Sequence, residues 1–399
     1  MNNEQIAEKN IAERKPKEST KRRWVILITI LLSTLYIFVG NKIAVQGMTL
    51  FDGKNYTAVQ KAKIVEIVDH IKEEHPLSET ETLVVEEIIF NAEAISGEKK
   101  GEILKGEQNL NTYAVAQLKP VKVGDKVLLY NIPNEDYGTE WTLGEYVRTD
   151  ALLLLGAIFM ILLILFGRQQ GFQTIISLIY TGLAIFVVFI PAILSGKNIY
   201  YWSILTCVFI ILMTFLVVSG LNKKSLAAGI GCFGGVLVSG GLTIIMDRIL
   251  KLTGMVDEDS VFLLLLNKEH PIDLKAIVFA AIIIGALGAV MDVAMSIASS
   301  LYEVKTQSKN VTFKMLIASG ITIGRDIMGT MANTLVLAYI GGSLGVVLLL
   351  ISYNTSLLDV LNRELVVVEI LQALVGSIGI LFTIPLTAIA SGFFFKHVD

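Results

Sequence analysis

Ionisable side chains lie within the most hydrophobic part of this chain, and their types and spacing could support chemistry. Asp292 lies in the segment GALGAVMDVAMSIASSLYEV (285–304), and Arg325 and Asp326 lie in GRDIMGTMANTLVLAYIGGSLG (324–345). A charge near the middle of a bilayer is costly, so such residues usually face a partner, a water-filled cavity or a pathway. The sequence therefore predicts a polar site inside a membrane.

Two polar stripes extend from these charges, and their members recur at the spacing of one helix face. The stripes consist of Asp292, Ser296 and Ser299 in the first segment and of Asp326, Thr330 and Asn333 in the second. Two facing stripes near one membrane surface would line a path for an ion or a solute. In the alternative interpretation, Asp292 pairs with Arg325 and joins two helices without any role in transport. The sequence leaves both interpretations open.

Two aspartates inside a membrane also suggest an intramembrane aspartyl protease, in which two carboxyl groups share a proton and activate a water. Arg325, adjacent to Asp326, favours the ionised carboxylate and works against proton sharing. No G-x-G-D motif contains Asp292, and the chain has no P-loop, H-E-x-x-H or C-x-x-C motif. We therefore predict neither an enzyme nor a nucleotide-binding protein.

Metal and redox chemistry find little support in the sequence. His70 and His75 enclose two glutamates, but a five-residue spacing does not place two histidines on one helix face. Both cysteines, Cys207 and Cys232, fall in apolar segments and are interpreted as small core residues. We predict no metal site, no disulfide and no cofactor.

The composition places the chain in a membrane. Of its 399 residues, 53% are hydrophobic and only 17% are charged, whereas ordinary soluble proteins are about 25% charged. The mean hydropathy is +0.65. Basic residues neither cluster on one face nor alternate with aromatic residues, so nucleic acid is not a predicted partner. The predicted partner is the lipid bilayer.

A helix needs ~20 predominantly apolar residues to cross a bilayer, and the chain contains about eight such segments. The first, residues 24–40, follows a basic tail at 1–23 and is interpreted as an uncleaved signal anchor rather than a cleaved signal peptide. The others form a multi-span region at 151–395, with candidates at Ala151–Phe166, Phe172–Leu194, Tyr201–Leu221, Leu226–Met246, Lys275–Met291, Ile327–Ile351 and Val366–Phe394. The predicted fold class is mainly α, a polytopic transmembrane helical bundle.

Residues 41–149 differ in character and are predicted to form a small β-rich domain between the first and second spans. Short β-branched runs are separated by turn signals, at 62–68, 82–95, 101–105 and 121–130. Within the last run, VKVGDKVLL predicts two strands around a Gly-Asp turn. If the basic tail is inside, the positive-inside rule places both termini in the cytoplasm and this domain outside it.

Two further segments do not fit simple helical hairpins. The apolar run Val261–Leu266 is too short to cross a membrane, and the sequence leaves open whether it lies on the surface or re-enters. Residues 311–323 have amphipathic spacing, for which a helix on the membrane surface is the preferred interpretation and re-entry the alternative. Gly231–Gly235 and Gly341–Gly345 have G-x-x-x-G spacing, and Gly285–Ala289 is similar. We interpret these as sites of close helix packing rather than hinges.

The quoted segments GALGAVMDVAMSIASSLYE and GRDIMGTMANTLVLAYIGGSLG resemble those of the YibE/F-like family of bacterial membrane proteins. The resemblance covers residues 152–394, and more weakly the outer domain. Carried over by position, it implies that the matching polar residues are Asp292, Ser296, Arg325, Asp326, Asn333 and Thr334. With residues 41–149 present, the chain resembles the longer, YibE-type members. The resemblance implies a bacterial cytoplasmic membrane and either a shorter YibF-like membrane partner or a homo-oligomer.

Two functions from different classes follow from these observations. The first is a transporter, or an efflux or permease component, with an intramembrane site at Asp292, Ser296, Arg325, Asp326, Thr330 and Asn333. The second is a non-transporting membrane scaffold or assembly protein whose outer domain binds a protein or an envelope partner. Neither hypothesis names a substrate.

Overall fold

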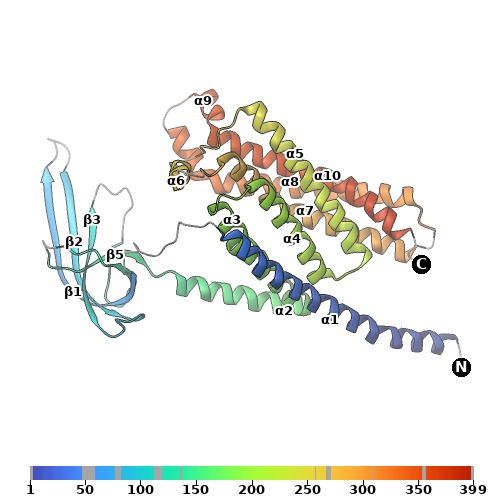
Figure 1. Cartoon of the computed structure of the whole chain (residues 1–399), viewed down its shortest axis with the longest axis horizontal. Helices are drawn as coiled ribbons and strands as arrows, with labels where there is room; N and C mark the ends of the chain where they lie inside the picture. Colours follow the sequence, from blue (N-terminus) through green and yellow to red (C-terminus); the bar gives the residue numbers. More distant parts are fainter. Residues whose placement is uncertain are drawn as a thin grey trace. The chain divides into compact units, whose positions relative to one another are not determined.

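The protein is represented by a computed structural model that describes residues 3–46, 59–76, 82–111, 119–134, 137–256, 258–266, 271–308, 310–352 and 356–396. Two compact units are present (Figure 1). One comprises residues 52–162 and contains the five strands found in the described part of the chain, and the other comprises residues 1–51 and 163–399, whose described elements are helical. The predicted combination of a helical bundle and a small β-rich domain is therefore confirmed.

The strands of the first unit close into a barrel in the order β1-β2-β3-β5-β4. Their bounds are β1 Val59–Pro76, β2 Thr82–Ala94, β3 Ile103–Asn111, β4 Lys126–Tyr130 and β5 Trp141–Tyr146. The pair β3–β5 is parallel, whereas β1 pairs antiparallel with both β2 and β4. This is the strand order of the OB-fold, a five-stranded barrel. Its interior is filled by its own core, which includes Ile64, Phe90, Leu129 and Trp141.

One predicted strand of the barrel is wrong. Residues 121–123 form no strand, although Gly124 does turn the chain, with a φ of +98°. The backbone N–H of Val121 donates instead to the Gln108 side chain (2.8 Å), and the Val121 side chain is buried in the barrel core. That donor is satisfied by a side chain, and the segment joins no ladder before β4.

The helices, of which only the first part of α2 (up to residue 162) belongs to the first unit, are interrupted by two π-helical segments, η1 and η2. The elements are α1 Asn3–Ala44, α2 Thr149–Leu183, η1 Ala184–Phe189, α3 Ile190–Leu194, α4 Ile199–Thr214, η2 Phe215–Ser219, α5 Lys223–Leu250, α6 Glu258–Leu266, α7 Leu274–Gln307, α8 Phe313–Ser352, α9 Leu357–Asn362 and α10 Glu364–Phe395. Within the described residues, seven helices are long and apolar enough to cross a membrane.

The longest of these apolar stretches, Thr149–Leu194, contains 46 residues and folds back on itself. Arg168 has non-helical dihedral angles (φ 49°, ψ −122°). A Cβ atom added to Gly171 would lie 1.8 Å from the carbonyl oxygen of Leu163, whereas residues eight apart in a straight helix are about 12 Å apart. The stretch therefore supplies two apolar segments, and the total agrees with the eight predicted from the sequence.

The helices α5 and α10 pack closely because glycines on one helix receive hydroxyl side chains of the other. A Cβ atom at Gly231 would lie 1.9 Å from Thr387 Oγ1, and one at Gly235 would lie 1.9 Å from Thr383 Oγ1. Small residues allow such close approach of helices in lipid. The interpretation of Gly231–Gly235 as a packing motif is confirmed.

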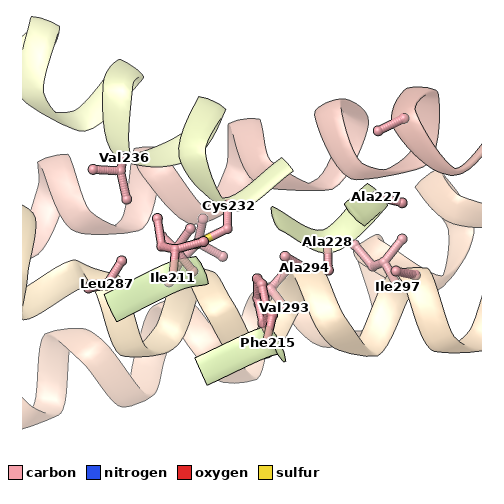
Figure 2. Packing of buried hydrophobic residues seen from close by; sticks show 14 of the residues in the cluster. Ile211, Phe215, Ala227, Ala228, Cys232, Val236, Leu287, Val293, Ala294 and Ile297 are labelled. Atoms are coloured by element: carbon pink, nitrogen blue, oxygen red, sulfur yellow. The ribbon is translucent and has the colours of Figure 1, made fainter. Parts of the chain in front are cut away.

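The helix α7 contributes the largest share of the core. Its buried side chains, among them Leu287, Val293 and Ile297, meet Ile211 of α4 and Cys232 of α5 in one cluster, which Figure 2 shows from close by. Both cysteines of the chain are buried thiols, which confirms their interpretation as core residues.

The helix α1 is fastened to the bundle through the two π-helical segments. The Nδ2 of Asn41 donates to the carbonyl of Val187 in η1 (2.7 Å), and the guanidinium of Arg22 donates to the carbonyl of Val218 in η2 (3.2 Å). Arg22 also donates to Gln173 Oε1 of α2 (3.2 Å). The wider turns of a π-helix are a common place for side chains to insert.

The predicted surface helix at 311–323 is wrong. From Phe313 onward these residues are the first turns of the continuous 40-residue helix α8. Leu316 and Gly320 are buried, and Gly320 packs against Ala388 of α10. The apolar face that suggested a membrane surface is therefore buried against a neighbouring helix.

Candidate functional site

Asp292 lies on an exposed stripe of the otherwise deeply packed helix α7. Its neighbours Val290 and Val293 are buried in the bundle core. The exposed positions recur at helical spacing and are Ala281, Gly285, Gly288, Asp292, Ser296 and Glu303. Ser299 is half-buried on the same stripe, and its hydroxyl donates to the sulfur of Met295 (3.6 Å). The stripe predicted from Asp292, Ser296 and Ser299 thus forms one face of the helix.

This face begins beside α8. A Cβ atom at Gly285 would lie 2.6 Å from the hydroxyl of Tyr339. Sixteen positions later, Leu301 lies against Gly320 of the same neighbouring helix (3.0 Å from an added Cβ). The two helices are therefore antiparallel. Asp292 lies between these two contact points on α7, level with the part of α8 that carries the second set of predicted residues.

The predicted polar residues of α8 are exposed. The set comprises Arg325, Asp326, Thr330, Asn333 and Thr334. Two of its hydroxyls are satisfied within the helix, because Thr330 donates to the carbonyl of Ile327 (2.9 Å) and Thr334 donates to that of Thr330 (2.8 Å). Asp326, Thr330 and Asn333 share a face, which is not the face that carries the buried Gly320 and Gly324. The stripe therefore faces away from the contact with α10.

The depth of these charges can be measured along α10. Gly324 packs against Ile384, because a Cβ atom added to Gly324 would lie 2.1 Å from the Cγ2 atom of that side chain. The eleven residues from Pro385 to Phe395 that end α10 are uncharged. At 1.5 Å per residue they span ~16 Å, about half of a ~30 Å hydrocarbon layer. Arg325, adjacent to Gly324, therefore lies well inside the apolar slab that α10 defines.

These deep charges are not used to join helices. In the described part of the chain, neither an ion pair nor a side-chain hydrogen bond engages Asp292, Arg325 or Asp326. The structure therefore places the two aspartates and the arginine on neighbouring helices without pairing them. The described side chains form no ion pair between Asp292 and Arg325, in contrast to the alternative interpretation in which this pair joins the two helices.

A second set of polar residues was not singled out from the sequence. Ser239 on α5 and Thr383, Thr387 and Ser391 on α10 are fully buried. Ser239 donates to the carbonyl of Val375 (3.3 Å), and Thr383 donates to that of Gly379 (2.8 Å). The i, i+4 repeat of hydroxyls on α10, matched to glycines on α5, was the available signal. Neutral hydroxyls in so tight a contact serve packing rather than a path.

The barrel carries its own polar centre. Glu107 is buried on β3, where it accepts from Asn134 Nδ2 (2.9 Å) and from Thr139 Oγ1 (2.7 Å). The loop between β4 and β5 is thereby held over that strand. His70, considered above as a metal ligand, contacts Glu86 across the β1–β2 pair. Among the described residues, no group of three His, Cys, Asp or Glu side chains could hold a metal ion.

Comparison with known proteins locates the family in the helical unit. The model of the family described as YibE/F-like protein matches residues 155–397. The match includes all six predicted site residues and leaves out α1 and the barrel. Neither a curated protein nor a solved structure matches the chain.

Proposed function

The chain belongs to the family of YibE/F-like proteins, and from that premise we propose that it is a transporter or a permease component of a membrane. One observation carries the proposal: Asp292 lies deep in an apolar helix, is exposed, and is unpaired among the described residues. Charges are retained at such depth mainly where they contact water, an ion or a translocated solute. A role in packing would require partners.

The geometry supports a path along α7. Gly288 presents no side chain on the stripe, and an added Cβ atom there would meet nothing within 4 Å, so the surface one turn before Asp292 is open; Ser296 continues the polar lining one turn further on. The Asp292 carboxylate would bind a proton or a cation at mid-depth. Arg325, on the neighbouring helix, would repel a cation from Asp292 or compensate the carboxylate once the cation has left.

The helix α8 is suited to move against this site. Its described buried residues are few, Leu316, Gly320, Gly324, Leu335 and Leu350. Alternating access requires one packed element to change the exposure of a fixed site. In this proposal, a shift of α8 along α10 would bring Arg325 toward Asp292 or away from it.

The proposal also includes a topology. The protein would lie in the bacterial cytoplasmic membrane with both termini in the cytoplasm and residues 41–149 outside it. The acidic residues around 257–273 would then lie outside and the Lys223–Lys224 pair inside, as the positive-inside rule requires. No enzymatic step and no cofactor is part of this function.

Thiol accessibility tests the water path. In a chain carrying Cys207→Ser and Cys232→Ser, a single cysteine at Asp292 is exposed to a small charged thiol reagent from either side of the membrane. We expect it to react, whereas the matched control Val290→Cys, buried two residues from Asp292, stays protected. Protection of position 292 in folded protein would contradict a water-lined path.

Ion flux tests the role of the carboxylate. The full chain is reconstituted into liposomes that contain a pH-sensitive dye, and a potassium diffusion potential is imposed. We expect proton entry that is abolished by Asp292→Asn and retained by Asp359→Asn, a control on α9 whose carboxylate pairs with Arg363 (3.4 Å). Equal flux in all three proteins and in empty liposomes would reject proton coupling at Asp292.

A second function is favoured by the barrel, which has a complete core of its own. The chain would then be a membrane scaffold whose outer domain binds a protein or an envelope polymer. Deletion of residues 55–140 would abolish the cellular function in this case, while Asp292→Asn and Asp326→Asn would leave it intact. The transporter proposal predicts the reverse sensitivity for the aspartates.

A further inference from the structure

An exposed seam runs along α8 for most of its length. Its members follow one another at spacings of four and three residues and are Asp326, Thr330, Asn333, Leu337, Gly341, Leu344 and Leu348. All seven are exposed, and Leu337, Leu344 and Leu348 each expose about half of their surface or more. The seam extends over ~33 Å, enough to cross a bilayer.

Lipid is a poor cover for one half of this seam. The apolar half, from Leu337 to Leu348, could face acyl chains. The polar half contains Asp326 and Asn333, beside Arg325, at the depth that the contact between Gly324 and Ile384 establishes. Unpaired polar groups in hydrocarbon cost several kcal/mol each, so this half requires a polar partner.

We propose that the seam of α8 is the interface with a second copy of this chain, arranged about a two-fold axis along the membrane normal. Both copies then have the same orientation, so the two α8 helices are parallel. Each residue lies at the same depth in the membrane as the equivalent residue of the other copy. Spacings of three and four residues keep all seven members on one face of the helix. The proposal does not rest on the transport function.

The order of charges on α8 is self-complementary in this arrangement. In a two-fold interface, residue i contacts residue j of the partner and j contacts i. Because Arg325 and Asp326 are adjacent, they differ in depth by only ~1.5 Å. Arg325 of each copy can therefore reach Asp326 of the other, which gives two equivalent ion pairs. Asn333, two turns away, can hydrogen-bond to the same residue of the second copy, as polar side chains do between helices in lipid.

The apolar half of the seam permits close contact. A Cβ atom added to Gly341 would meet nothing within 4 Å, and the same holds for Gly345. The notch formed by these glycines can receive Leu344 of the partner. The Gly341–Gly345 motif, unlike Gly231–Gly235, thus finds its packing partner outside the described chain.

Cysteine cross-linking tests the seam without altering its charges. In a full-length chain carrying Cys207→Ser and Cys232→Ser, Leu344→Cys is compared with Leu237→Cys in lipid vesicles under mild oxidation. The two leucines are matched, with exposed fractions of 51% on α8 and 49% on α5. We expect disulfide-linked dimers for Leu344→Cys in large excess over Leu237→Cys. Equal yields, or no dimer at position 344, would overturn the proposal.

Charge reversal tests the pairing. We expect Arg325→Asp and Asp326→Arg each to weaken the dimerisation constant about tenfold, the equivalent of ~1.4 kcal/mol. The doubly reversed chain recreates both pairs and should dimerise like the original protein. The molecular mass in nanodiscs and the thermal transition are measured for each variant. A doubly reversed chain that keeps the original transition but stays monomeric would overturn the pairing, as would a monomeric original protein.

Discussion

Gly235 of α5 lies directly beneath the hydroxyl of Thr383 on α10, so that an added Cβ atom would lie 1.9 Å from Oγ1. The threonine occupies the space that any side chain at position 235 would need. Thr383 is fully buried and donates its proton to Gly379 of its own helix (2.8 Å). The hydroxyl is therefore held in place and cannot readily move aside.

The first prediction follows from this contact. Gly235→Ala should lower the free energy of unfolding by about 1–3 kcal/mol, because overpacking displaces α10. The matched control is Gly241→Ala on the same helix, where an added Cβ atom meets nothing within 4 Å. Thermal unfolding in detergent checks the pair. Equal transition temperatures would show that the two helices are not in this contact.

The fold-back of α2 provides the second prediction. Gly171→Ala would place a Cβ atom 1.8 Å from the backbone oxygen of Leu163, which cannot move without opening the bend. We expect a loss of about 3 kcal/mol, at the upper end of overpacking effects. Gly167→Ala, four residues earlier and without a contact within 4 Å, should be nearly neutral. Thermal transitions of the two variants distinguish a bend from a straight helix, in which the two substitutions would behave alike.

The third prediction concerns the barrel. Glu107→Ala removes the acceptor of Asn134 Nδ2 and Thr139 Oγ1 and should destabilise the barrel by about 2–3 kcal/mol. Glu145→Ala is the control, because the pair between Glu145 and Arg148 is exposed and contributes little.

The measurement uses urea unfolding of the full chain, followed by the fluorescence of Trp141. Trp24→Phe and Trp202→Phe make that residue the sole tryptophan. A midpoint for Glu107→Ala that equals that of the control would contradict the role of Glu107 in holding the loop.

The fourth prediction is a pH dependence of barrel stability. The Tyr146 hydroxyl donates to the carbonyl of Lys119 (2.6 Å), and burial, with a further contribution from the carboxylate of Asp125, raises the pKa of Tyr146 above its ordinary value. The unfolded chain therefore loses this proton first. The stabilisation is complete below about pH 10 and is lost as the pH rises through the raised value.

Urea midpoints monitored by Trp141 check this prediction. Between about pH 9 and about pH 11, a range that spans the ordinary pKa of tyrosine, the original barrel should lose more stability than Tyr146→Phe, which has no proton to lose. Parallel curves for the two proteins would show that Tyr146 titrates alike in the folded and unfolded states.

The sequence predicted the features that depend on local pattern. Apolar length located the spans, including the two joined at Arg168, and the composition of residues 41–149 indicated strands. Helical spacing also placed Asp292 and Ser296 on one face, where the structure has them. Each of these depends on residues that are close together in the chain.

Features that depend on distant residues were not predicted. Closure of the barrel requires β1 to pair with β4, and the missing strand at Val121 depends on the side chain of Gln108. The amphipathic stretch before Arg325 belongs to α8 because Ala388, distant in the sequence, covers Gly320. The sequence also left open whether Asp292 pairs, because pairing is set by how two helices are rotated.

The fastening of α1 has a consequence for biosynthesis. Asn41 finds its acceptor 146 residues later in the chain, and Arg22 finds one 196 residues later. During translation, α1 therefore enters the membrane long before either carbonyl exists. Until η1 and η2 have been inserted, both donors must be satisfied by water, headgroups or the insertion machinery. The contacts of α1 with η1 and η2 therefore form only after those two segments have been made, and α1 must stay in position until then.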